Sequence, residues 1–454
     1  MKKNHVQLEE NALSLGESIV MGVAGTAPAY SLAATTSVLI ATVGLLSLAS
    51  LFYCGLIMFG VTLAFLHLNR AHTCAGASYS WVGQVFHPIL GFFSGWSLLV
   101  ATVVFMVSGT IPAATATLAL VSPEHINSPF IVALVAAGWL LFVSAIVIKG
   151  IKLSSYFQVL LTVLEIGLLV LIIGGAFWAF SSSPIKPFDW SQFSITHFTV
   201  QSFATGTLTA LFFFWGWDVT VNLSEETRNA ADNPGRGAVA SMFIVLFLFL
   251  SFIIVVQFAF TDDEIKNAGT NLLFVLSDKI FPRPWSYVAV IAVVVSTVGT
   301  LETSILQFTR TMFAKGRDGI LHPRYAQLHK TWKTPWRATM VITSIGLILL
   351  AIAAFFPTIN KVIEISVQAI GFQIAFYYGL ACFACAWRFR LVASNSVGDF
   401  ILLLVWPILS GCFMAFIFIS CAFILDTTAI ALGIGGIAIG AIPLLLNKKL
   451  RRSI

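Results

Sequence analysis

The stretch MGVAGTAPAY at positions 21–30 interrupts the first long apolar segment of the chain. Gly22, Gly25 and Pro28 fall within seven residues of one another, and both residue types disfavour the interior of a helix. Proline has no N–H and clashes with the preceding turn, but it suits the first position of a new helix. The pattern therefore predicts one helix that ends near Ala24 and a second helix that starts near Pro28.

The chain around this break has a composition suited to lipid. Of its 454 residues, 58% are hydrophobic and 10% are charged, whereas a soluble domain carries about 25% charged residues. A hydrocarbon core of ~30 Å requires about 20 apolar residues in one helix. About twelve such spans occur, at residues 15–43, 46–68, 88–121, 129–148, 153–180, 198–223, 238–260, 285–313, 338–356, 362–387, 400–425 and 429–446. These runs are continuous, unlike the ~10-residue alternating segments of a β-barrel, so we expect an all-α polytopic membrane protein.

The positions of the basic residues support this count. Lys and Arg collect in cytoplasmic loops, and with the N-terminus inside, strict alternation puts 20 of the 25 on the cytoplasmic side. The five on the outer side are Lys186, Lys266, Lys279, Arg283 and Lys361. We therefore expect both termini in the cytoplasm and the protein in the plasma (cell inner) membrane. The net charge of +6 then reflects topology, and we expect no nucleic-acid partner.

A second break is expected in the sixth span, at residues 214–218, which read FWGWD. A lipid-facing helix would contain neither the glycine nor the acid of this stretch. Breaks in the first and sixth spans, five spans apart, indicate inverted repeats with a binding site near the midplane. A new helix start offers N–H groups to an anion, and a helix end offers C=O groups to a cation. A small polar solute that carries both charges suits such a pair, so we expect a carrier of such a solute.

Four stretches resemble the amino acid–polyamine–organocation (APC) permeases. They are residues 15–30, which look like that family's first helix with its unwound centre, then 75–81 with 91–96, 213–218 with 225–229, and 310–323 with 334–335. The resemblance implies a LeuT-like fold of five plus five inverted-repeat helices, two further helices, and alternating access. The family's first break is usually rich in glycine, whereas the matching positions here are Pro28, Ala29 and Tyr30.

The resemblance also implies how the chain is organised. Residues 1–14 are expected to form a cytoplasmic segment, and residues 15–390 the ten-helix transport core. Within that core we expect a first repeat at 15–180 and a second at 198–390. The remaining expectations are two additional helices at 391–446 and a cytoplasmic tail at 447–454.

Substrate contacts are expected at the two breaks and on the third span. Backbone donors remain at Ala29, Tyr30 and Ser31, although the ring of Tyr30 adds bulk. Trp215 and Trp217 flank the second break. The candidate substrate-binding residues are Ala24, Gly25, Thr26, Ala27, Ala29, Tyr30, Ser31, Phe105, Phe214, Trp215, Gly216, Trp217 and Asp218.

Three acids inside predicted spans, Glu165, Asp218 and Glu302, are candidates for proton coupling. An unpaired carboxylate in the membrane costs at least ~2.5 kcal/mol, so each needs a function or a partner. Similar permeases often carry lysine at the position of Glu165, near the sodium site of related carriers. A buried carboxyl there could load and release a proton. The alternatives are structural hydrogen bonds or salt bridges, and for Asp218 a bond to a substrate amine or to the freed backbone.

Two further groups of polar residues belong with these acids. Ser296 and Thr300, one turn apart, form a possible sodium site, although hydroxyls in membrane helices more often bond the backbone. Glu225 and Glu226 follow the second break at the cytoplasmic exit, where arginines such as Arg228 could form gate salt bridges. We expect no metal and no organic cofactor.

The function favoured by these patterns is a secondary active transporter (permease) for an amino acid or related small amine, driven by protons. The alternative is a substrate exchanger or an amine or polyamine carrier. The sequence lacks a G-x-x-x-x-G-K-[ST] motif, which argues against ATP hydrolysis. An enzyme would need a convergent catalytic set and a receptor a soluble output domain, and neither is visible. The expected partners are the small-molecule substrate, a proton or a sodium ion, and the lipid bilayer.

Overall fold

Helices make up nearly all of this computed structural model, which describes residues 7–355 and 359–446. Within those residues the β-structure is one isolated bridge between Leu13 and Thr227. The first six residues of the expected cytoplasmic segment and the expected tail at 447–454 lie outside the described residues. The all-α prediction is confirmed.

The first break forms where the sequence predicts it. Helix α1 (Leu15–Gly25) starts with a capping box, in which the Ser14 side chain bonds the Glu17 N–H and the Glu17 side chain bonds the Ser14 N–H. Helix α2 (Pro28–Val43) has its proline in the first turn, as the missing N–H of proline favours. Ala27, between the two helices, adopts a left-handed conformation with φ of 48°. The predicted end near Ala24 and start near Pro28 are confirmed.

The second break is longer than the first. Helix α9 (Val200–Leu211) is followed by a single 3₁₀ turn at Phe212–Phe214, and the short helix α10 (Val219–Asn222) comes after it. Gly216 lies between them with φ of 105°, a conformation that side chains with a Cβ rarely adopt. The predicted interruption of the sixth span is therefore confirmed.

Ten stretches of the described chain are long and apolar enough to cross a membrane. They are Leu15–Ala71, Pro88–Val121, Pro129–Ile148, Ile151–Phe180, Asn233–Ala259, Trp285–Arg317, Trp336–Ala353, Val362–Phe389, Val397–Ile424 and Thr427–Leu445. The first stretch contains two predicted spans, because only a 3₁₀ turn at Gly44–Leu46 separates α2 from α3 (Ser47–Ala71). The shorter apolar helix Val200–Phe214 lies in the predicted sixth span. Together these stretches account for the twelve predicted spans of a polytopic membrane protein.

The other helices complete the arrangement. They are α4 (Ser78–Val85), α5 (Pro88–Ser108), α6 (Thr110–Val121), α7 (Pro129–Ile148), α8 (Ile151–Phe180), α11 (Asn233–Ala259), α12 (Asp262–Ala268), α13 (Leu272–Ile280), α14 (Val288–Arg317), α15 (Trp336–Ala353), α16 (Ile359–Phe389), α17 (Val397–Asp399), α18 (Trp406–Ile424), α19 (Thr427–Ala438) and α20 (Ala441–Leu446). The predicted boundaries of the two repeats, 15–180 and 198–390, stay a prediction.

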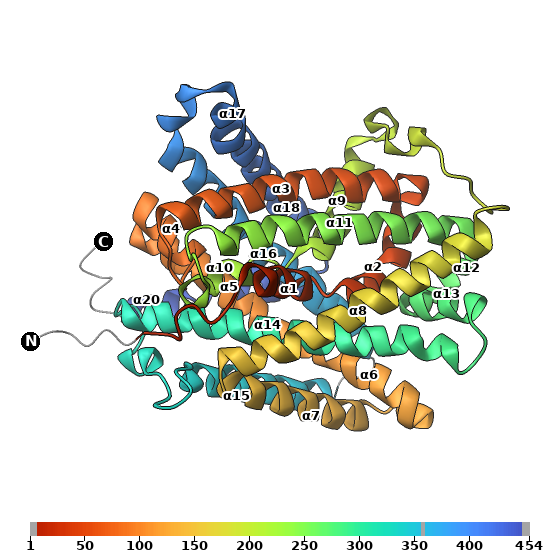
Figure 1. Cartoon of the computed structure of the whole chain (residues 1–454), viewed down its shortest axis with the longest axis horizontal. Helices are drawn as coiled ribbons and strands as arrows, with labels where there is room; N and C mark the ends of the chain where they lie inside the picture. The colour runs from red at the N-terminus through yellow and green to blue at the C-terminus, as the bar shows by residue number, and fades with distance from the viewer. Residues whose placement is uncertain (1–6, 356–358, 447–454) are drawn as a thin grey trace, which may run out of the picture.

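The broken helices lie in the middle of the molecule. Figure 1 shows α1 and α10 at the centre, with α3 and α11 on one side and α15 and α7 on the other. Helix α1 packs against α11, α8, α14 and α10. Helix α20 lies at one end of the molecule, and α12 and α13 lie at the opposite end (Figure 1). Because α3 and α14 finish at the first end with Arg70 and Arg317, we name it the basic end.

Candidate functional site

The two breaks touch each other through their backbones, at Gly25 and Gly216. A Cβ added to Gly25 would lie 2.1 Å from the carbonyl oxygen of Gly216, and a Cβ added to Gly216 would lie 2.0 Å from the carbonyl oxygen of Gly25. Real Cβ atoms do not approach oxygen so closely, so both positions require glycine in this arrangement. The contact joins two segments that are nearly 200 residues apart in the chain and makes one site of the two breaks.

The backbone N–H groups of the first break all find acceptors inside the protein. The hydrogen bonds run from Thr26 to the Val23 carbonyl (3.1 Å), Ala27 to the Ala24 carbonyl (3.1 Å), Ala29 to Glu165 Oε1 (2.9 Å), Tyr30 to Ser296 Oγ (3.2 Å) and Ser31 to the Ala27 carbonyl (2.7 Å). A buried N–H without a partner is costly, which explains this complete pairing. The donors that the sequence offers to a substrate are therefore occupied in this conformation.

Glu165 connects the first break to helix α8. Its side chain is 1% exposed and comes from α8. Its carboxylate accepts from the Ala29 N–H at the start of α2, where the helix dipole favours a negative charge. Ser296 of α14 faces the same carboxylate and accepts from the Tyr30 N–H. The structure thus brings Glu165 and Ser296 together at the first break.

Thr300 contacts the other side of the first break. Its hydroxyl lies within hydrogen-bonding distance of the Ala24 carbonyl at the end of α1 and of the Ser296 carbonyl one turn earlier in α14. A hydroxyl has only one proton to donate, so these two carbonyls share it. Thr300 thus bonds the backbone, which was the alternative to a sodium site. The sodium site at Ser296 and Thr300 stays a proposal.

Asp218 faces α16 from the second break. Tyr377 donates to its Oδ2 at 3.0 Å, and Tyr378 donates to its Oδ1 at 2.9 Å. The indole N–H of Trp215 in turn bonds the hydroxyl of Tyr377 at 3.0 Å. Sequence reasoning missed both tyrosines, although two adjacent tyrosines within the span at 362–387 were a visible signal. The pair holds the Asp218 carboxylate in a buried position, with one hydrogen bond to each of its oxygens.

The aromatic candidates separate into two groups. Phe105 of α5 meets the ring of Trp215 edge-on at 5.5 Å, and Tyr30 meets Phe212 at 6.2 Å. These rings lie at the breaks. By contrast, the rings of Phe214 and Trp217 pack into neighbouring helices, against Phe249 of α11 at 5.7 Å and Tyr378 of α16 at 5.5 Å respectively. Phe105 and Trp215 therefore form an aromatic pair at the second break.

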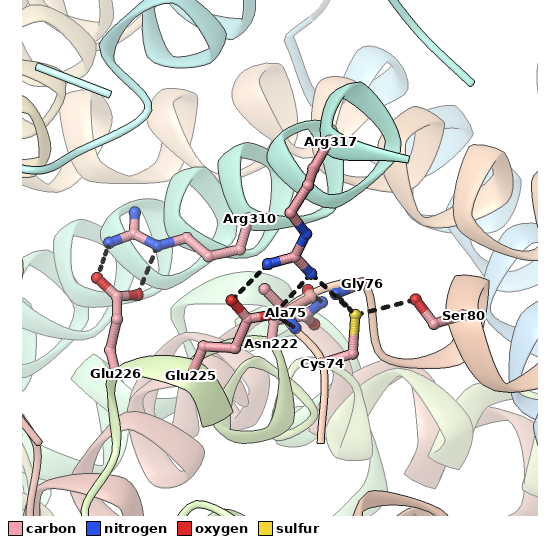
Figure 2. A network of polar contacts seen from close by, with 9 residues as sticks. All are labelled: Cys74, Ala75, Gly76, Ser80, Asn222, Glu225, Glu226, Arg310 and Arg317. Atoms are coloured by element: carbon pink, nitrogen blue, oxygen red, sulfur yellow. Dashed lines mark hydrogen bonds and ion pairs between the residues drawn. The ribbon is translucent and has the colours of Figure 1, made fainter. Parts of the chain in front are cut away.

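At the basic end, two arginines of α14 bind the two glutamates that follow α10 (Figure 2). Arg310 bonds both oxygens of Glu226 at 2.8 Å, and Arg317 bonds the two oxygens of Glu225 at 2.7 and 2.8 Å. The expected partner, Arg228, instead donates its N–H to the Leu13 carbonyl and its side chain to the Asn11 carbonyl. That expectation was wrong because it weighed neighbours in the chain, whereas α14 approaches this turn in space.

The ion pair between Arg317 and Glu225 is part of a larger polar network at the basic end, which also includes the backbone of Ala75. The Glu225 carboxylate also accepts from the Ala75 N–H at 2.8 Å, and Asn222 bonds the Ala75 carbonyl at 2.9 Å (Figure 2). Burial by itself would raise the pKa of Glu225, but the bonds from Arg317 and Ala75 outweigh it and hold the pKa below its usual value. Glu225 is thus charged at neutral pH, and two ion pairs link α14 to the turn after α10 at the basic end.

Glu302 is buried on α14 and faces Gln158 of α8. The structure therefore does not gather the three candidate acids into one cluster: Glu165 is at the first break, Asp218 is at the second break facing α16, and Glu302 is between α8 and α14. Among the residues that the structure describes, no group of three or more His, Cys, Asp or Glu side chains could hold a metal ion.

Comparisons with known proteins agree on one family. The family model described as "Amino acid permease" matches residues 13–432. The chain is 24% identical over 295 residues to the methylthioribose transporter of Bacillus subtilis (strain 168), covering 62% of this chain and 61% of that protein. It is 27% identical over 303 residues to the low-affinity putrescine importer PlaP of Escherichia coli (strain K12), covering 63% of each. It is 24% identical over 339 residues to the serine/threonine exchanger SteT of Bacillus subtilis (strain 168), covering 72% and 70%. The match spans about three fifths of the length of the first two relatives.

Proposed function

This chain belongs to the amino acid permease family of the APC superfamily, and we propose that it is a secondary active transporter of an amino acid or related small amine. The transporter works by alternating access and is driven by protons. The solute lies between the two breaks, against the candidate residues of α1, α2, α5 and the segment from Phe214 to Asp218. The basic end faces the cytoplasm, because Lys and Arg collect on that side of a membrane.

The observation that carries this proposal is the meeting of two backbone breaks beside a buried carboxylate. The Gly25–Gly216 contact brings a helix end and a helix start together in the centre of the molecule. The adjacent Glu165 carboxylate holds the first N–H of α2 at 2.9 Å. Irregular backbone at membrane depth persists only beside protein or a polar cavity, and broken helices of this kind bind substrates in carriers.

Proton coupling follows from the position of Glu165. A charged carboxylate makes a stronger hydrogen bond than a neutral one, and the N-terminus of a helix favours an anion by about 0.3–2 kcal/mol. Protonation of Glu165 removes the charge and weakens its bond to Ala29. The start of α2 is then available to the carboxylate of a solute, so that proton and solute load together. Loss of the proton restores the bond and expels the solute.

Alternating access requires that the closed basic end opens. In the present conformation the residues of both breaks are buried, and the pairs Arg310–Glu226 and Arg317–Glu225 connect α14 to the turn after α10. Movement of α1 and α10 away from α14 would break these pairs and expose the site to the cytoplasm. We therefore assign the two pairs to the inner gate of the carrier.

The proposal is tested by uptake into proteoliposomes that contain the purified full-length protein. Labelled serine, branched-chain amino acids and putrescine are offered under an imposed pH gradient, a sodium gradient, or neither. Uptake that follows the pH gradient supports the proposal, and Glu165→Gln is expected to abolish the pH dependence. Uptake of no member of the panel contradicts the solute class. Uptake that requires sodium and ignores pH contradicts proton coupling and favours the site at Ser296 and Thr300.

A carrier or exchanger of cationic amines is the second candidate. Within the described residues, Glu165, Asp218 and Glu302 form no ion pair with Lys or Arg, whereas Glu225 and Glu226 do. Unpaired acids near the site favour a positively charged solute. Competition between putrescine and serine for uptake distinguishes this candidate, because only an amine carrier prefers putrescine.

A further inference from the structure

The buried face of α8 changes from polar to apolar at Glu165. After Ile151 in the first turn, its buried residues toward the basic end are all polar: Ser154, Ser155, Gln158, Thr162 and Glu165. Toward the opposite end they are all apolar: Leu169, Ile172 and Ala176. The residues follow a helical spacing of three or four, so they form one stripe along the side that faces the core.

Helix α14 packs against α8 and runs antiparallel to it (Figure 1). Its buried face changes from apolar to mostly polar at Ser296, which faces Glu165. Its buried residues before Ser296 are all apolar: Ala289, Val290, Ala292 and Val295. From Ser296 toward the basic end, buried polar residues predominate, with Ser296, Thr297, Thr300, Glu302 and Thr303 in two turns. The polar halves of the two helices thus face each other on the side between Glu165 and the basic end.

Gln158 connects the two polar halves. With its amide oriented so that the nitrogen donates, it bonds the Gly299 carbonyl at 3.0 Å and Glu302 Oε2 at 2.9 Å, and its oxygen accepts from Thr162 at 3.0 Å. A Cβ on Gly299 would lie 2.7 Å from the terminal amide atom of Gln158 that faces Thr162, so the glycine leaves room for this approach. The other oxygen of Glu302, Oε1, is buried without a hydrogen bond among the described residues, which is unusual for a carboxyl group.

The polar stripe reaches the surface of the basic end through Glu17. The Ser155 hydroxyl donates to Glu17 Oε1 at 2.8 Å, and Glu17 lies in the first turn of α1 with partial exposure. At 1.5 Å per residue, Gln158 lies about 10 Å and Ser155 about 15 Å from Glu165 along the helix. The charged groups around the stripe are paired elsewhere: Arg310 bonds Glu226, Lys152 bonds Glu9, and Arg228 bonds the Asn11 carbonyl.

We propose that these residues form a one-sided proton route, the α8 column, which consists of Glu165, Thr162, Gln158, Glu302, Ser155 and Glu17. This inference rests on the proposed proton coupling. Glu165 gives its proton to the Glu302 carboxylate, Glu302 gives it to Glu17, and Glu17 gives it to cytoplasmic water, so that three carboxylates remain and no other reactant is consumed. Gln158 positions Glu302, while Thr162 and Ser155 supply hydroxyls along the way. The apolar residues beyond Glu165 block the same face of α8 toward the outside.

The test separates proton release from solute movement. Full-length wild type, Glu302→Gln and Glu17→Gln are compared in proteoliposomes with labelled serine and labelled putrescine as probes. Accumulation driven by a pH gradient requires release of the proton, whereas counterflow, the exchange of labelled for unlabelled solute, does not. The control is Glu124→Gln, because Glu124 is an exposed glutamate in the connection from α6 to α7, away from the column.

Glutamine fills the space of glutamate but neither takes up nor releases a proton, and Glu17→Gln still suits the capping box with Ser14. We expect each column variant to lose about tenfold or more of the gradient-driven accumulation, since positioned proton transfer contributes at least that much. Counterflow should stay close to the wild-type rate, and the control should keep both activities.

Three outcomes overturn the route. If both variants accumulate solute like the wild type, the proton leaves by another path and the proposed function stands. If both variants lose counterflow as well as accumulation, the residues serve the transport cycle or the fold and not proton release. If the wild type itself accumulates solute without regard to pH, the route fails together with proton coupling.

Discussion

Arg310 and Glu226 form a doubly hydrogen-bonded ion pair, with both N···O distances at 2.8 Å, at the basic end of the molecule. The two side chains are 0% and 1% exposed. Arg310 belongs to a membrane-spanning helix, and Glu226 belongs to the turn that follows the second break. The pair therefore couples the position of the broken helix to that of α14.

Loss of one partner of this pair should open the basic end. Glu226→Gln leaves a buried guanidinium without its counter-ion, which destabilises a protein by about 3–5 kcal/mol. We expect a lower midpoint of thermal unfolding in detergent. We also expect faster labelling of the Cys74 thiol by a thiol-reactive probe, because Cys74 lies beside Arg317 at the basic end (Figure 2). The matched control is Asp232→Asn, which breaks the partly exposed pair with Arg70 and should change stability by about 0–1 kcal/mol. Equal effects of the two substitutions would contradict the assignment of Arg310–Glu226 to the gate.

The second gate pair makes stability depend on pH. The pKa of Glu225 is held below its usual value in the folded protein by Arg317 and the Ala75 N–H, despite burial. A lowered folded pKa means that the stabilisation is fully present above the unfolded pKa of about 4.3 and is lost as pH falls through the lower folded value. We expect the difference in thermal midpoint between wild type and Glu225→Gln to be constant near neutral pH and to shrink in acid. A difference that grows as the pH falls would contradict this sign.

The contact between the breaks should not tolerate a methyl group. Gly216→Ala places a Cβ 2.0 Å from the Gly25 carbonyl oxygen at a φ of 105°, so the two breaks must separate. We expect transport to be lost and the thermal midpoint to fall. Gly174→Ala is the control, because a Cβ there meets nothing within 4 Å and alanine stabilises a helix by about 0.5–1 kcal/mol relative to glycine. Normal transport by Gly216→Ala would remove the contact from the site.

The two tyrosines should determine how Asp218 behaves. A hydrogen bond to a charged group contributes about 1.5–3 kcal/mol, so Tyr377→Phe and Tyr378→Phe should each lower stability by an amount in that range. In Asp218→Asn the same tyrosine substitutions should have smaller effects, because the charge is gone. The energies come from chemical unfolding of six proteins: the wild type and Asp218→Asn, each with neither tyrosine changed, with Tyr377→Phe or with Tyr378→Phe. If the effects are unchanged in Asp218→Asn, the carboxylate is not what the tyrosines bond.

Local chemistry explains why much of the fold could be predicted. Gly22, Gly25 and Pro28 break a helix through effects that act within one or two turns, so the end of α1 and the start of α2 are readable from ten residues. The number of spans is equally local, because each depends on about 20 consecutive apolar residues. Hydropathy alone does not place every boundary between spans. Leu15–Ala71 forms one apolar stretch, because the turn of three residues between α2 and α3 is apolar too.

The sequence by itself determined the lipid-spanning helices, the positions of the two breaks and the acids that lie inside the membrane. Only the tertiary structure decided what satisfies those breaks. The Ala29 N–H bonds Glu165, which is 136 residues away, and Asp218 bonds Tyr377 and Tyr378 at separations of 159 and 160 residues. Glu225 and Glu226 form ion pairs with Arg317 and Arg310 of α14 and not with Arg228, which is near them in the chain. The physical reason is that a side chain's hydrogen-bond partner depends on helix packing in three dimensions, whereas a helix break depends on the backbone chemistry of its own few residues.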